Sequence, residues 1–157
     1  MSHHTALSTV VRINRAGELE LPSYTRALLH PEIQFGGPDE FDVGQLRTWI
    51  YPGYESGLIG KDVVFRHLEQ ENMLERCIGL MHLQAIRDAD LPFLDAWEGN
   101  VLPAWKTVIL HGDFPSVSVP YLDRAMRIQW AHLADSHPRF PVIYSLPYRA
   151  KLVGVIV

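Results

Sequence analysis

Eight histidines are the side chains of this chain best suited to bind a metal ion or to transfer a proton near neutral pH. Zinc ligands usually follow one another at short spacings, and only His132 and His137 are separated in this way. Their order and neighbours match no zinc-finger or zinc-protease pattern, and Cys77 and His82 have no second ligand pair nearby. We therefore expect no metal site and no cofactor, with most histidines at the surface or partly buried.

The single cysteine, Cys77, excludes a disulfide within the chain and favours a reducing compartment. A thiol becomes a nucleophile when a histidine lies beside it in space. Cys77 falls on the same helical face as Leu74, Ile78 and Met81, where a small core residue is expected instead. The chain also has no Gly-x-Ser-x-Gly elbow and no glycine-rich phosphate loop, so we expect no catalytic residue.

Aromatic side chains gather around a glycine-rich loop in the first half of the chain. Trp49 and Tyr51 share one side of an alternating segment with Arg47, and Tyr54 follows in the loop. Trp, Tyr and Arg are the residue types that carry most of the binding energy at protein interfaces. We therefore expect these four residues to bind a partner protein. The alternative is that the same face packs in the core, because large aromatic side chains are usually mostly buried.

The segment 17–26, with the sequence GELELPSYTR, contains a glycine, two alternating apolar residues, a proline and an arginine four residues later. Over residues 9–29 the chain resembles the swapped-hairpin domain of AbrB- and MazE-type DNA-binding regulators. The resemblance implies a dimer that binds DNA phosphates through three arginines, Arg12, Arg15 and Arg26. Glu18 and Glu20 stand where such domains are usually basic.

The elements that position these residues follow from apolar alternation and turn residues. Residues 7–14 and 18–21 flank a turn at 15–17 and are expected to form a hairpin. Loops are expected at 35–44 and 52–57 from their glycine, proline and aspartate content. The remaining strands are expected at 45–51, 105–111, 140–147 and 150–157.

Helices are expected mainly in the middle of the chain. Apolar spacing favours a helix over 67–79 and leaves 80–86 undecided between helix and strand. A serine cap and a proline predict a helix over 120–135, although residues 126–130 also alternate as in a strand. Two shorter helices are expected, over 23–29 and 91–99.

Composition limits the kind of protein that this can be. The chain has 157 residues, of which 47% are hydrophobic and 20% charged, and its formal charge is −4. These values are close to the average for globular domains and exclude a disordered chain. The mild acidity argues against a generic nucleic-acid binder, which normally carries a basic excess.

We therefore expect one α+β domain over residues 1–157, with a flexible loop region at 36–60. Its sheet is expected to be mixed or antiparallel and built from the N- and C-terminal strands, with two to four helices from the middle of the chain. The first residues lack the pattern of a signal peptide, and no apolar run is long enough to cross a membrane. The sequence thus predicts a soluble cytoplasmic protein.

Three classes of function remain open. The first is a non-enzymatic protein-binding module, such as an inhibitor, an immunity-type protein, an adaptor or an assembly subunit. It is favoured by the absence of a catalytic motif, the small size and the mild acidity. The second is a DNA-binding regulator of the AbrB or MazE type that uses the hairpin at 9–29. The third is a small enzyme whose site is assembled from distant His, Asp and Glu residues.

Overall fold

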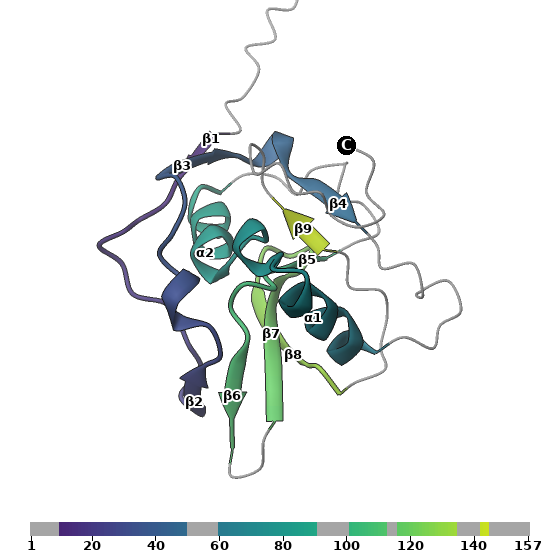
Figure 1. Ribbon diagram of the computed structural model, residues 1–157. Helices are drawn as coiled ribbons and strands as arrows, with labels where there is room; N and C mark the ends of the chain where they lie inside the picture. Colours follow the sequence, from purple (N-terminus) through teal and green to yellow (C-terminus); the bar gives the residue numbers. More distant parts are fainter. Residues whose placement is uncertain (1–9, 50–59, 91–100, 113–115, 135–141, 145–157) are drawn as a thin grey trace, which may run out of the picture.

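The computed structural model describes residues 10–49, 60–90, 101–112, 116–134 and 142–144 (Figure 1). Its strands are β1 (Val10–Arg12), β2 (Thr25–Leu28), β3 (Glu40–Asp42), β4 (Arg47–Trp49), β5 (Leu102–Pro103), β6 (Ile109–His111), β7 (Ser116–Leu122), β8 (Ile128–His132) and β9 (Val142–Tyr144). Its helices are α1 (Lys61–Gln70) and α2 (Leu80–Asp88), with short 3₁₀ helices η1 (Pro31–Ile33), η2 (Val43–Gln45) and η4 (Leu74–Arg76). This mixture of helices and antiparallel strands confirms the α+β class.

Strand β7 organises the largest sheet, which contains five antiparallel strands. Strand β6 pairs with residues 116–118 of β7 and β5 with residues 121–122, while β8 pairs with residues 118–122. Residues 118, 121 and 122 therefore have a partner strand on each side, so β5 and β6 lie on one edge of β7 and β8 on the other. Strand β2 pairs with the far side of β6.

Two smaller sheets join segments that are distant in sequence. Strand β1 pairs with β3, and β4 pairs with the late strand β9. Among the described residues, the five strands of the main sheet lie between Thr25 and His132, so they come from the middle of the chain, whereas the early strand β1 and the late strand β9 belong to the smaller sheets. The predicted strands at 45–51 and 140–147 are confirmed over the central residues of each range.

The hairpin expected from 7–14 and 18–21 is wrong. Residues 18–21 form no strand, and the partner of β1 is β3. The backbone of 18–20 is satisfied by a side chain of α2 instead: the Glu20 N–H donates to Gln84 Oε1 at 2.8 Å, and Gln84 Nε2 donates to Glu18 O at 3.1 Å. The helix expected over 23–29 is also wrong, since residues 25–28 form β2.

The helices contribute to two apolar clusters. Val64, Phe65 and Leu68 of α1 pack with Trp105 and Val119, and the Phe65 and Trp105 rings are stacked 6.5 Å apart. The second cluster joins α2 to β1, β3, β5 and β7 through buried side chains that include Leu83, Ile86, Val11, Phe41, Leu102 and Leu122. Because α1 contributes to one cluster and α2 to the other, both helices pack on the strands (Figure 1).

The helix expected over 67–79 is displaced in the structure. Helix α1 ends at Gln70, and Asn72 has a left-handed φ of 54°, which stops the helix. The apolar residues that follow are buried without forming a continuous helix, and α2 begins at Leu80. Segment 80–86, undecided from sequence, is therefore helical. The loop expected at 52–57, the helix expected over 91–99 and the strand expected at 150–157 lie outside the described residues.

The helix expected over 120–135 is wrong, and the alternative of a strand is correct. Strands β7 and β8 form a hairpin there, with five paired positions in unbroken register. The turn is built by Asp123, whose carboxylate accepts the Ala125 N–H at 2.9 Å and the Arg127 N–H at 3.0 Å. Met126 has a φ of 61°, so the chain reverses where a helix would have continued.

We expect Asp123→Ala to lower the free energy of unfolding by about 1–2 kcal/mol, because it removes the acceptor of two backbone N–H groups in the turn. Burial raises the pKa of this carboxyl. Hydrogen bonds from the Arg127 N–H, Gln129 and the Ala125 N–H lower it by a larger amount, so the pKa of Asp123 is below its usual value. Urea denaturation at pH 7 measures the effect. Asp123→Asn, which keeps one acceptor oxygen, should be milder, and an unchanged alanine variant would contradict this role.

Candidate functional site

The residues expected to bind a partner lie only partly within the described structure. Arg47 and Trp49 are the ends of β4, where they stand opposite Tyr144 and Val142 of β9. Arg47 is exposed, whereas Tyr51 and Tyr54 lie outside the described residues. An interface at this aromatic segment therefore stays a prediction.

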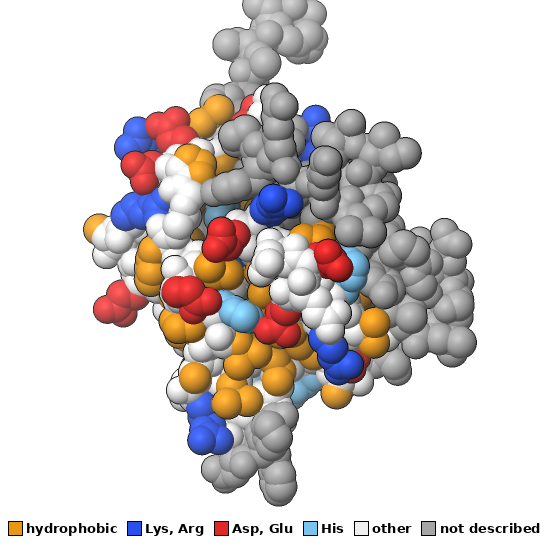
Figure 2. Space-filling view, viewed as in Figure 1, with side chains coloured by type: hydrophobic (Ala, Val, Ile, Leu, Met, Phe, Trp, Pro, Cys, Tyr) orange, Lys and Arg blue, Asp and Glu red, His pale blue; other side chains and the backbone are white. Residues whose placement is uncertain are grey.

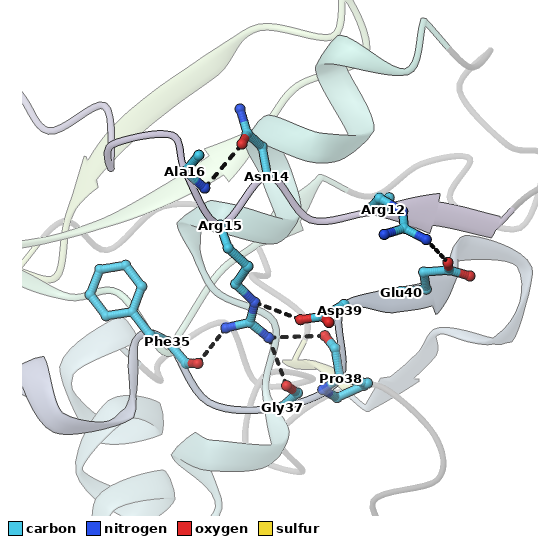
Figure 3. A network of polar contacts seen from close by, with 9 residues as sticks. All are labelled: Arg12, Asn14, Arg15, Ala16, Phe35, Gly37, Pro38, Asp39 and Glu40. Carbon is cyan, nitrogen blue, oxygen red and sulfur yellow. Dashed lines mark hydrogen bonds and ion pairs between the residues drawn. The ribbon is translucent and has the colours of Figure 1, made fainter.

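The three arginines expected to meet DNA phosphates all have partners within the chain. Arg12 forms an ion pair with Glu40 at 2.6 Å across the β1–β3 pair. The Arg15 guanidinium bonds Asp39 at 3.0 Å and the backbone carbonyls of the loop 35–38, including Gly37 O at 2.7 Å (Figure 3). Arg26 donates to Gly112 O at 3.2 Å. Arg15 therefore positions the loop that leads into β3.

The two edges of the main sheet differ in how they are protected. At β2 the register shifts between Thr25 and Ala27, and Arg26 is the exposed residue at the irregularity. A bulge and a charged side chain both discourage the addition of another strand. At the other edge, β8 has the sequence IQWAH and contains no bulge, proline, lysine or arginine. It therefore lacks these protecting features.

The backbone direction along β8 follows from its partner strand. The Ala104 N–H donates to Pro120 O at 2.8 Å, so the backbone groups of Pro120 point away from β8. In an antiparallel ladder the opposite residue, Trp130, must then also point away from β7. The bond from the Leu133 N–H to Val117 O, at 2.9 Å, fits the same alternation.

The outer edge of β8 consequently presents the N–H and C=O groups of Ile128, Trp130 and His132. Within the described part of the chain, no other strand pairs with these groups and no backbone hydrogen bond uses them. Alternate residues along a strand are about 6.6–6.8 Å apart, so the three form a row that an extended peptide matches in spacing.

A cavity of about 390 Å³ lies beside the C-terminal end of β8, between that strand and α1. Its apolar lining comes from Leu29, Phe65, Val117 and Leu133, and its polar lining includes Asp62, Arg66, Glu69 and His132. Hydrophobic side chains also gather over β6 and β7 on the face shown in Figure 2. The edge of β8 thus ends beside an apolar depression with charged residues around it.

The structure also brings together three residues of the types that small enzymes use. His111 Nε2 lies 2.8 Å from Ser118 Oγ, and the His111 ring centroid is 4.9 Å from that of His132. Burial, together with the charge of His132, lowers the pKa of His111, which keeps it neutral at pH 7. Ser118 is only 2% exposed, so its hydroxyl is closed to a substrate and the pair stabilises the strands.

Cys77 is a core residue, as expected from the sequence. Its thiol is buried and donates to Met73 O at 3.5 Å. Burial raises the pKa of Cys77 to about 12, so it carries no thiolate near neutral pH. The described residues contain no group of three or more His, Cys, Asp and Glu side chains placed to hold a metal ion.

No protein-family model, curated protein or solved structure matches this chain. Among the described helices, none has the length and apolar character needed to cross a bilayer. The β8 edge was missed from sequence because the helical spacing over 120–135 took precedence. The signal that could have revealed it was the alternation of Met126, Ile128 and Trp130.

Proposed function

We propose that this protein is a non-enzymatic protein-binding module, and that an extended segment of its partner adds to the sheet along the outer edge of β8. The observation that carries the proposal is the row of outward-facing backbone groups at Ile128, Trp130 and His132 on a regular, uncharged edge strand. An inhibitor, an immunity-type protein, an adaptor or an assembly subunit can each use such a surface.

The neighbouring cavity supports a partner segment with a bulky apolar side chain. Backbone pairing supplies affinity without sequence preference, and pockets beside the strand supply specificity. The cavity next to His132 offers Phe65, Val117 and Leu133 as an apolar lining, and its volume of about 390 Å³ suits one large side chain. We therefore expect the partner strand to place an aromatic or long aliphatic residue there.

The test uses a proline at an outward-facing position. His132→Pro removes one N–H of the outer edge without removing a bond to β7, because His132 stands opposite Ser118 as a non-hydrogen-bonded pair. We expect capture of the partner from the native host to fall at least about tenfold, as the loss of a backbone bond and the steric block together predict. His132→Ala is the matched control, since it removes the ring and keeps the N–H.

Amide hydrogen exchange locates the binding surface. We expect the amides of Ile128 and Trp130 to exchange rapidly in the free protein and to become protected in the complex, while those of β2 stay unchanged. A partner captured equally by His132→Pro and wild type would overturn strand addition at β8. A homodimer that protects the same amides would show that the partner strand is a second copy, and salt-sensitive DNA binding without such protection would favour the regulator instead.

A further inference from the structure

Lys106 lies at a small cavity that the strand-binding proposal does not use. The cavity has a volume of about 160 Å³ and is lined by Lys106, Glu32, Glu75, Ile33 and the glycines at 36 and 37. Lys106 is only 2% exposed, which is exceptional for a lysine. A buried amine that borders a cavity needs an explanation that packing alone does not give.

The backbone and stem of Lys106 are firmly held. Gln34 Nε2 donates to Lys106 O at 2.7 Å, and the Lys106 N–H donates to Ile78 O at 3.2 Å. The stem passes close to Gly79, where an added Cβ would lie 3.2 Å from Lys106 Cδ. Because Gly79 has no side chain, the stem fits there, and the direction of the amine is set by the fold.

The amino group itself has no partner among the described residues. Among the described residues, Lys106 Nζ forms no hydrogen bond or ion pair. It is also not one of the fully buried side-chain atoms that lack a partner, so part of its surface is open. It therefore reaches the cavity. Burial lowers the pKa of Lys106, Cys77 and the Glu75 carboxylate oppose this, and the charge of Arg15 adds a smaller lowering. A larger fraction of the amine is therefore neutral than in an exposed lysine.

The surroundings of the amine decide which ligand it can take. Glu32 and Glu75 line the same cavity and repel an anion, and burial disfavours a charged complex. A neutral electrophile is compatible with both conditions. The volume corresponds to about five water molecules, which suits a compound of three or four carbon atoms.

We propose that Lys106 binds a small aldehyde covalently, as an imine, in this cavity. The lone pair of Nζ attacks the carbonyl carbon and forms a carbinolamine. The Glu75 carboxylate takes the proton lost by nitrogen and returns it to the hydroxyl group, which leaves as water. The products are the imine and one water molecule, with no change of oxidation state.

Reductive trapping tests the proposal on the full chain. Propanal and sodium cyanoborohydride convert an imine into a stable secondary amine, which peptide mass spectrometry locates. The chain has three lysines, Lys61, Lys106 and Lys151, so each is followed separately. Lys61 is a built-in control, because it is also 2% exposed but does not line this cavity. At pH 7 we expect Lys106 to react faster than the other two, by about tenfold for each unit by which its pKa is lowered.

Two variants separate the roles of the cavity residues. Glu75→Gln should slow the trapping of Lys106 by about tenfold or more, as expected for the loss of a proton-transferring group. Glu71→Gln is the matched control, since Glu71 is exposed and does not line the cavity. Trapping of Lys106 no faster than that of Lys61 and Lys151, or only after urea unfolding, would overturn the proposal. Because β8 is not involved, failure here leaves the strand-binding proposal intact.

Discussion

Replacing Thr107 with valine is expected to lower the free energy of unfolding by about 2–4 kcal/mol, because it leaves two buried polar groups without partners. The Thr107 hydroxyl accepts the Leu80 N–H at 2.8 Å and donates to Gln34 Oε1 at 2.6 Å. Thr107 is fully buried and Gln34 nearly so, so water cannot replace these bonds. Valine has nearly the same shape, which confines the change to the hydroxyl group.

The effect should extend to Lys106. Gln34 uses Oε1 for Thr107 and Nε2 for the Lys106 carbonyl, so a freed Gln34 holds that backbone less firmly. Urea denaturation gives the free energy of unfolding, and Thr107→Ser is the control that keeps the hydroxyl and loses one methyl group. We expect the serine variant to lose about 1 kcal/mol. Equal losses for valine and serine would show that packing, and not the bonds of Thr107, sets the stability at this position.

Acid is expected to destabilise the protein through His82. This histidine is buried on α2, where its Nδ1 accepts the Gly79 N–H at 3.0 Å and its ring meets Phe41 at 4.9 Å. Burial, with the charges of Lys106 and Arg15, lowers the pKa of His82 to about 3. The ordinary pKa of histidine is about 6.5, so at mildly acidic pH this residue is protonated in the unfolded chain and neutral in the folded chain.

The direction of the pH effect follows from that difference. Between pH 6.5 and about pH 3 the unfolded state holds more protons at this site, so stability falls as the pH falls. From pH 7 to pH 4.5 the loss due to His82 should be about 2–3 kcal/mol. The free energy of unfolding measured by urea at both pH values checks this. His82→Gln, which keeps an acceptor for Gly79, should show a smaller loss, and an equal loss in both proteins would exclude His82 as the source.

Several features that depend on local composition could be predicted from the sequence. It predicted the α+β class, the burial of Cys77 and the strand at β4, all of which the structure confirms. These features follow from the residue types of one segment. Alternation places every second side chain on one face, and an apolar cysteine among apolar neighbours is buried whatever the details of the fold.

The pairing of segments, by contrast, depends on contacts between distant parts of the chain. The same residues at 120–135 satisfy a helical and a strand pattern, and the turn at Asp123 with the partner strands β5 and β6 selected the strands. Likewise β1 pairs with β3, and the side chain of Gln84 on α2 satisfies the backbone of 18–20 in place of a hairpin partner. The outer edge of β8, which has no partner strand among the described residues, and the buried amine of Lys106 both depend on neighbours that lie far away along the chain. Local periodicity carries no information on such contacts, because pairing depends on the whole set of available partners.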